Sequence, residues 1–166
     1  ARMSYSTEQI RNIALAGHAG AGKTTLFEAL LLAGGAIQTA GSIERGSTTS
    51  DFDAQEKARG HSIDTVIASV ELKNCHINLI DTAGYADFRG PTLSALNAVE
   101  TVAVVVNAVN GIEHGTRRLM HYARERRLAR LLVINHIDAD GLDLAALVDS
   151  LREEFGKVCL PVNLPA

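Results

Sequence analysis

Three features that would each indicate a particular class of protein are missing from this chain. No apolar run approaches the roughly 20 residues of a membrane-spanning helix, and residues 1–9 are polar, without the apolar core of a signal peptide. The formal net charge of −3 is small, which gives no reason to expect a surface that binds nucleic acid or lipid. We therefore expect no membrane partner and no sequence-specific nucleic-acid partner.

Cysteine is also scarce, because the sequence contains only Cys75 and Cys159. Both lie in apolar segments that read as strands, so we interpret them as reduced, buried small side chains rather than as a disulfide or a metal site. Reduced cysteines fit a cytoplasmic protein. The 166 residues, of which 46% are apolar, are enough for one hydrophobic core and are ordinary for a globular domain.

Apolar runs with strand character alternate with helical patterns along the chain. The predicted strands are residues 13–16, 66–72, 78–80, 102–106, 131–134 and 158–162. The predicted helices are residues 24–33, 92–99, 115–127 and 142–155. This alternation is typical of βαβ units and predicts an α/β fold, with a mostly parallel sheet and helices on both faces.

Three of these elements carry further expectations. The β-branched run 102–106 should be the most buried strand, and 66–72 alternates like an edge strand. Helix 24–33 places Leu26, Ala29, Leu30 and Ala33 at helical spacing. Between helix 24–33 and strand 66–72, residues 34–60 are rich in glycine, serine, threonine and charged residues, which predicts a long functional loop.

The first strand leads into a phosphate-loop pattern, G-x-x-x-x-G-K-[ST]. It consists of Gly17, His18, Ala19, Gly20, Ala21, Gly22, Lys23 and Thr24, with Thr25 following. Glycines allow successive backbone N–H groups to face one anion at a helix N-terminus, while the lysine contacts the β- and γ-phosphates and the threonine hydroxyl binds Mg²⁺. A glycine-rich turn with an exposed lysine is the alternative, which the strand before the motif and the helix after it disfavour.

A second phosphate motif, D-x-x-G, ends the strand at 78–80 and consists of Asp81, Thr82, Ala83 and Gly84. In this position the aspartate would hold Mg²⁺, usually through water, and the glycine N–H would contact the γ-phosphate. A simple turn would explain the motif alone. Its place, 57 residues after Thr24 and beyond one loop and one strand, favours the nucleotide site.

A third motif follows the strand at 131–134, where Asn135, His136, Ile137 and Asp138 fit N-K-x-D at three of four positions. A carboxylate at Asp138 can accept hydrogen bonds from N1–H and N2–H₂ of guanine, a donor pair that adenine lacks. His136 stands where lysine is usual and could stack on the base. A polar turn, or a site for ATP, remains the alternative reading.

With these motifs, the chain resembles the GTPase domain of elongation factor G and its paralogues over nearly its full length. The matching stretches are residues 10–13, 17–25, 51–63 and 81–88. The resemblance implies a P-loop, Ras-like GTPase fold that is C-terminally incomplete here, with residues 1–9 as an extension and 10–166 as the GTP-binding domain. It also implies a first switch at about 36–63, GTP or GDP with Mg²⁺, a ribosome partner for the full-length protein, and a monomeric fragment.

The chain departs from that family at several positions: Gly20 replaces aspartate, Ala83 replaces proline, Ser62 replaces threonine and Tyr85 replaces the histidine that positions the attacking water. The resemblance assigns Mg²⁺ to Thr24, Ser62 and Asp81. It assigns the chemistry to Lys23, Gly84 and Tyr85. Because tyrosine has an ordinary pKa of about 10, Tyr85 implies slow GTP hydrolysis without a partner. The alternative is a regulatory module that binds nucleotide with little or no turnover.

Overall fold

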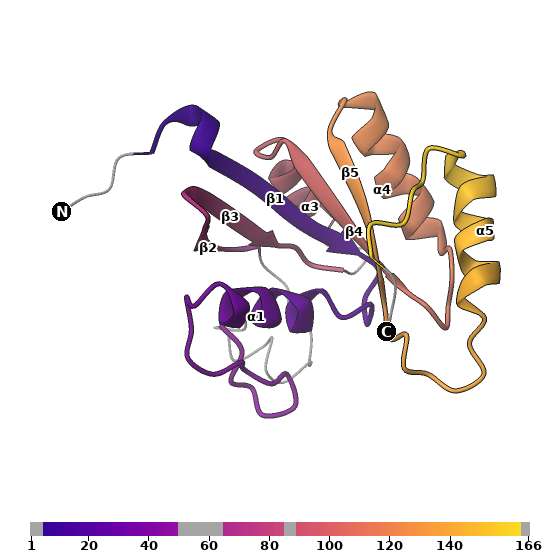
Figure 1. Ribbon diagram of the computed structural model, residues 1–166, viewed down its shortest axis with the longest axis horizontal. Coiled ribbons are helices and arrows are strands. Elements are labelled where there is room, and N and C mark those ends of the chain that lie inside the picture. The colour runs from indigo at the N-terminus through magenta and orange to yellow at the C-terminus, as the bar shows by residue number, and fades with distance from the viewer. Residues whose placement is uncertain (1–4, 50–64, 85–88, 164–166) are drawn as a thin grey trace.

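The sheet of this protein has five strands in the order β2-β3-β1-β4-β5 (Figure 1). The computed structural model describes residues 5–49, 65–84 and 89–163. The strands are β1 (Ile10–Gly17), β2 (Val66–Leu72), β3 (Cys75–Asp81), β4 (Thr101–Asn107) and β5 (Ala129–Asn135). β1 runs parallel to β3 and β4, and β4 runs parallel to β5, so the predicted mostly parallel sheet is confirmed.

Only β2 runs antiparallel, and the turn that precedes β3 explains this. Leu72 pairs with Cys75 across a two-residue turn. The two turn residues, Lys73 and Asn74, have positive φ angles of 48° and 64°. Such turns join antiparallel strands, whereas a parallel pair needs a crossover of a dozen or more residues. β2 is therefore an edge strand, as its alternating pattern predicts.

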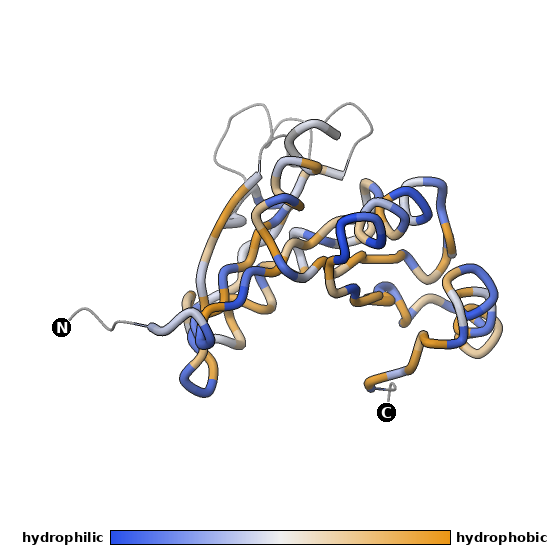
Figure 2. The backbone as a smooth tube through the Cα atoms, turned by 90° about the horizontal axis from the view of Figure 1, so that it is seen from above, coloured by the Kyte–Doolittle hydropathy of each residue, from blue (hydrophilic) through white to orange (hydrophobic). Residues whose placement is uncertain are grey.

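Helices cover both faces of the sheet (Figure 1). Helix α1 (Lys23–Ala33) packs Phe27 and Leu31 against one face. Helices α3 (Arg89–Leu96) and α4 (His114–Glu125) cover the other face, and α5 (Leu144–Phe155) packs beside α4 and β5. Figure 2 shows hydrophobic residues concentrated along the central strands, where β4 is buried from residue 102 to 106, as expected. Among the described helices, none is both long and apolar enough to cross a bilayer.

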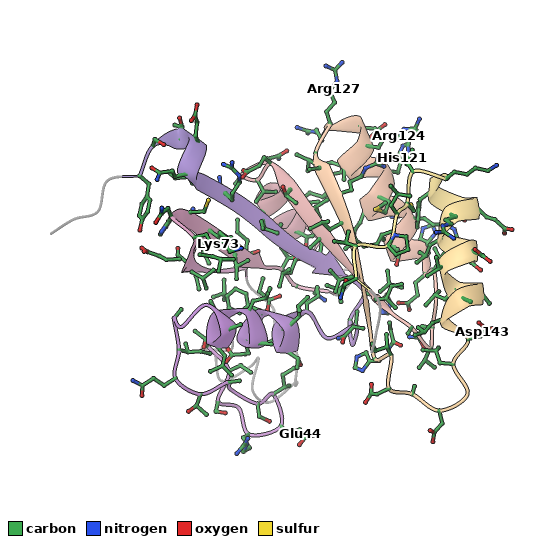
Figure 3. All side chains as sticks on the ribbon, in the orientation of Figure 1. Glu44, Lys73, His121, Arg124, Arg127 and Asp143 are labelled. Carbon is green, nitrogen blue, oxygen red and sulfur yellow. The ribbon has the colours of Figure 1, made fainter. Side chains whose placement is uncertain are left out.

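The structure changes three details of the predicted helices. In α1 the most buried apolar side chains are Phe27 and Leu31, whereas Leu30 is 37% exposed, because the helix is apolar on most sides and tertiary contacts choose the face. α3 ends at Leu96, short of the expected residue 99. α5 begins two residues late because Asp143, labelled in Figure 3, caps it by accepting a 2.9 Å hydrogen bond from the Ala146 N–H.

The predicted last strand, 158–162, is wrong. These residues form no strand, and Val158, Leu160 and Val162 are 79%, 75% and 90% exposed. Their apolar pattern is visible near the C-terminus in Figure 2, but they pair with no strand of the sheet. Cys159 lies in this segment, outside any described strand, and is half-buried. Cys75 is half-buried at the start of β3. Neither cysteine is the fully buried side chain that we expect from the sequence.

Candidate functional site

The three motifs lie at the same edge of the sheet. β1 ends at Gly17, β3 ends at Asp81 and β5 ends at Asn135. Leu15 is in register with Asp81, so the ends of β1 and β3 are adjacent. Parallel strands direct their carboxyl ends to one edge, where α/β folds bind their ligands. The parallel order of β3, β1, β4 and β5 therefore brings the loops together.

The phosphate loop between β1 and α1 takes the left-handed backbone that its glycines permit. Gly20 and Gly22 have φ angles of 76° and 87°, and Gly22 is the N-terminal cap of α1. A side chain at Gly22 would also collide with the amide of Asn135. The glycine is thus required both by the turn and by the close approach of the third motif.

Lys23 points back into this loop. Its Nζ donates a 3.0 Å hydrogen bond to the His18 carbonyl, and the residue is only 6% exposed. Burial lowers the pKa of the Lys23 ammonium below its ordinary value, and the negative charge of Asp81 opposes that shift. An ammonium held in a partly desolvated concavity gains most from a phosphate anion, so the geometry suits a polyphosphate.

Gly84 brings the second motif against the first. A Cβ atom at Gly84 would collide with Lys23 Nζ and lie 2.8 Å from the Ala19 nitrogen. The corner is anchored by the Thr82 hydroxyl, which donates a 2.8 Å hydrogen bond to the Leu15 carbonyl. The missing side chain at Gly84 therefore lets the second motif lie directly against the lysine and the backbone of the phosphate loop.

Two of the residues predicted to bind Mg²⁺ meet at one point. Thr24 Oγ1 donates a 2.8 Å hydrogen bond to Asp81 Oδ2, and both residues are buried. Within the described part of the chain, no group of three or more metal-ligating side chains is present. Hydroxyl and carboxylate oxygens are ligands that Mg²⁺ prefers, and this ion usually takes one or two protein groups together with water and phosphate oxygens. The donor set therefore fits Mg²⁺ held together with a nucleotide.

The third motif supports the phosphate loop from the side of β5. Asn135 Nδ2 donates a 3.0 Å hydrogen bond to the Ala21 carbonyl. His136 is exposed, with a positive φ of 57°, and Asp138 is exposed in the turn that follows. The His136 ring lies beside Gly22 of the phosphate loop, and Asn135 links the third motif to that loop.

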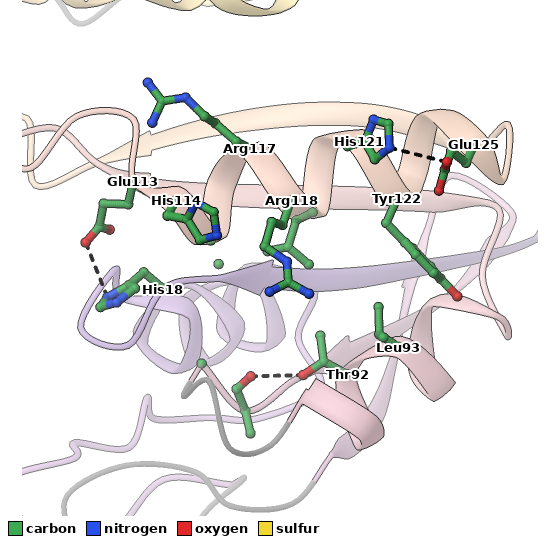
Figure 4. A pocket seen from close by; sticks show the side chains of 15 residues that line it. His18, Thr92, Leu93, Glu113, His114, Arg117, Arg118, His121, Tyr122 and Glu125 are labelled. Carbon is green, nitrogen blue, oxygen red and sulfur yellow. Dashed lines mark hydrogen bonds and ion pairs between the residues drawn. The ribbon is translucent and has the colours of Figure 1, made fainter.

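The side chain of His18, in the phosphate loop, contacts a residue outside the three motifs. Its side chain is half-exposed, and Nδ1 lies 3.4 Å from Glu113 Oε1, at the start of α4 (Figure 4). The pair stands at one end of a groove of about 830 Å³ between the phosphate loop, α3 and α4. Arg118 points across this groove from α4 toward α3 (Figure 4). The phosphate loop therefore also touches α4, an element that no motif indicates.

Two predicted site residues, Ser62 and Tyr85, lie outside the described residues, together with 50–63 of the predicted first switch. Conversely, no motif of the sequence identifies Glu28. This residue is 1% exposed in α1 and accepts a 2.6 Å hydrogen bond from the Gly41 N–H. A lone carboxylate within an apolar helix was the only sequence signal that could have identified it.

Known proteins resemble this chain in sequence and in fold. Residues 8–163 match the family described as "Elongation factor Tu GTP binding domain". The chain is 37% identical to peptide chain release factor 3 of Trichodesmium erythraeum over 99% of its length, and 37% identical to tetracycline resistance protein TetW of Butyrivibrio fibrisolvens over 89%. A solved structure of a Thermus thermophilus protein superposes with a TM-score of 0.85 at 38% identity, covering 89% of this chain and 22% of that one.

The matched relatives are much longer than the chain, which spans 31% of that release factor and 23% of TetW. The comparisons therefore concern a nucleotide-binding domain within larger proteins.

Proposed function

This chain belongs to the family of the elongation factor Tu GTP-binding domain and is a translational GTPase domain. On that premise we propose that it binds and hydrolyses Mg²⁺–GTP. It would do so as the G domain of an elongation factor G-like protein that acts on the ribosome in the cytoplasm. The observation that carries the proposal is the meeting of Lys23, Gly84 and the Thr24–Asp81 pair at one sheet edge.

Each residue of the site would have its own task in binding and hydrolysing GTP. Backbone N–H groups of residues 20–25 hold the phosphates, and Lys23 neutralises charge on the β- and γ-groups. Thr24 and Asp81, with Ser62, would hold Mg²⁺, which supplies further positive charge at the phosphates. The Gly84 N–H would contact the γ-phosphate, and Asp138 would select guanine. Phosphoryl transfer to water requires mainly positioning and charge neutralisation, which is what these groups offer.

The two named relatives are a peptide chain release factor and a tetracycline resistance protein. Peptide-chain release and resistance to tetracycline are different tasks, so the names of these relatives do not fix one task for this domain. We propose only the step they would share, a GTPase cycle on the ribosome.

A module that binds GTP with little turnover is the second candidate. It is favoured by Tyr85, where the family has histidine, and by the exposed His136, where lysine is usual. Phosphate release from GTP, measured with and without ribosomes, distinguishes the two functions. Stimulation by ribosomes supports the GTPase cycle, whereas tight GTP binding with no release in either condition supports the regulatory module.

Nucleotide choice is tested by competition. GTP should displace a fluorescent guanine nucleotide from the protein at far lower concentration than ATP does. Equal competition by ATP would contradict the proposed role of Asp138 and with it guanine specificity.

A further inference from the structure

A compact loop, residues 41–49, lies beside α1 and closes on itself. The Ser47 N–H donates a 3.1 Å hydrogen bond to the Ser42 carbonyl, and the Gly46 N–H donates a 3.0 Å bond to the Ile43 carbonyl. The first residue of this loop, Gly41, tolerates no side chain, because a Cβ atom would collide with the carbonyl of Ser47. The two ends of the loop therefore approach each other in a narrow neck. Figure 3 labels Glu44 at the tip of this loop.

The carboxylate of Glu28 holds both sides of the neck. Oε2 accepts a 2.6 Å hydrogen bond from the Gly41 N–H, and Oε1 accepts one from the Thr49 N–H. Glu28 is 1% exposed, and a buried carboxylate is unfavourable unless hydrogen bonds compensate its lost hydration. A glutamine would direct its NH₂ group at one of the two donors, so the site requires two acceptor oxygens.

Glu28 lies on the same buried face of α1 as the Mg²⁺ candidate Thr24. The two residues are four apart, the spacing of neighbours on one helix face, which is a rise of about 6 Å. Thr24 is hydrogen-bonded to Asp81, and Lys23 opens the helix. One short, rigid element thus contacts the phosphate site at its first turn and the neck of the 41–49 loop at its second.

We propose that Glu28 is a positioning residue that couples the phosphate site to the 41–49 loop. This inference rests on the proposed function, since the event that Glu28 transmits is the binding of nucleotide phosphates at Lys23 and Thr24. Phosphate binding holds the first turn of α1 in place, and the carboxylate passes that restraint to the neck. By linkage, whatever holds the loop closed also strengthens nucleotide binding by the same factor.

Hydrogen exchange of the full chain tests the coupling, with GDP and Mg²⁺ as the probe. In the wild type, GDP should slow exchange of the Gly46 and Ser47 amides, whose bonds lie within the loop. In Glu28→Gln, which keeps the shape of the side chain, GDP should still bind but should no longer slow these two amides. Glu28→Ala should give the same result.

The matched control is Val104→Ala, which removes buried volume from the opposite face of the sheet. It should lower stability yet keep the full effect of GDP on the loop amides. If Glu28 only stabilised the fold, a loss of stability at Val104 would weaken that effect as well. The affinity of Glu28→Gln for GDP should also fall, by up to the factor by which GDP slows exchange in the wild type.

Two outcomes would overturn the inference separately from the proposed function. If the wild type binds GDP but the loop amides do not respond, or respond equally in Glu28→Gln, the coupling is absent while the nucleotide site stands. If the wild type binds no guanine nucleotide, both proposals fall.

Discussion

The hydroxyl of Thr24 and the carboxylate of Asp81 are joined by a 2.8 Å hydrogen bond, although 57 positions separate them in the chain. This bond links the first turn of α1 to the end of β3, so the two phosphate motifs form one rigid unit. In the proposed function the pair would meet one Mg²⁺ from two motifs, Thr24 through its hydroxyl and Asp81 usually through water.

Asp81→Asn should weaken Mg²⁺-dependent nucleotide binding about tenfold or more, because an amide lacks the charge that makes hydrogen bonds and ion contacts strong. GDP affinity measured with Mg²⁺ and with a chelator gives the Mg²⁺-dependent part directly. Asp149→Asn is the control, since Asp149 is 71% exposed on α5 and paired with Arg152. An unchanged Mg²⁺ dependence in Asp81→Asn would remove Asp81 from the metal site.

Gly84→Ala should weaken GTP binding by at least about tenfold, because a Cβ atom at Gly84 would collide with Lys23 Nζ and crowd the backbone of Ala19. Titration with a non-hydrolysable GTP analogue measures the loss. Gly90→Ala is a matched control: it adds the same methyl group in α3, where nothing lies within 4 Å. Similar affinities for the two variants would contradict the close packing at Gly84.

Asp138→Ala should reduce the preference for GTP over ATP by about a hundredfold or more, since guanine would lose the acceptor for its N1–H and N2–H₂ groups. Competition of each nucleotide against a fluorescent GDP analogue reports the preference. Asp140→Ala is the control, because it removes a neighbouring carboxylate and should leave the preference for GTP over ATP unchanged. Guanine recognition would have to lie elsewhere if both variants kept the wild-type preference.

Lys23 should make the stability of the nucleotide-free protein depend on alkaline pH. Burial lowers its pKa in the folded protein, whereas the unfolded chain keeps the ordinary value of 10.5. Between those two values the unfolded chain binds more protons, so the free energy of unfolding should rise with pH across that window. The difference in urea unfolding between wild type and Lys23→Met, followed over alkaline pH, isolates this contribution.

The same shift predicts proton uptake on nucleotide binding. Phosphate charge beside the ammonium favours its protonated form, so GDP binding in this alkaline window should take up protons. Titration calorimetry in buffers of different ionisation enthalpy measures the uptake. Lys23→Met should show none of this uptake, and an equal uptake in both proteins would assign it to another group.

Tyr85→His should increase single-turnover GTP hydrolysis, because a neutral imidazole can orient and accept from the attacking water near neutral pH, whereas tyrosine with a pKa of about 10 cannot act as a base there. The assay is run with the protein alone and with ribosomes. A variant no faster than the parent in either condition would show that Tyr85 does not limit the reaction.

Most of the sheet is readable from the sequence because its signals are local. The β-branched run in β4 is apolar on both sides, so it predicts a strand buried on both faces, and residues 66–72 alternate as an edge strand does. The segment 158–162 carries a similar apolar pattern but makes no strand. A strand exists only where a partner supplies backbone hydrogen bonds, and the pattern holds no information about the partner.

The amino-acid order alone determined the three motifs that are proposed to meet phosphate, Mg²⁺ and guanine, since each motif is a short run at the end of a predicted strand. Only the tertiary structure decided that Gly84 lies against Lys23, that Asn135 supports the phosphate loop, and that Glu28 holds the neck of the 41–49 loop. These contacts join segments far apart in the chain. Their distances follow from how strands pair and helices pack, which no local periodicity encodes.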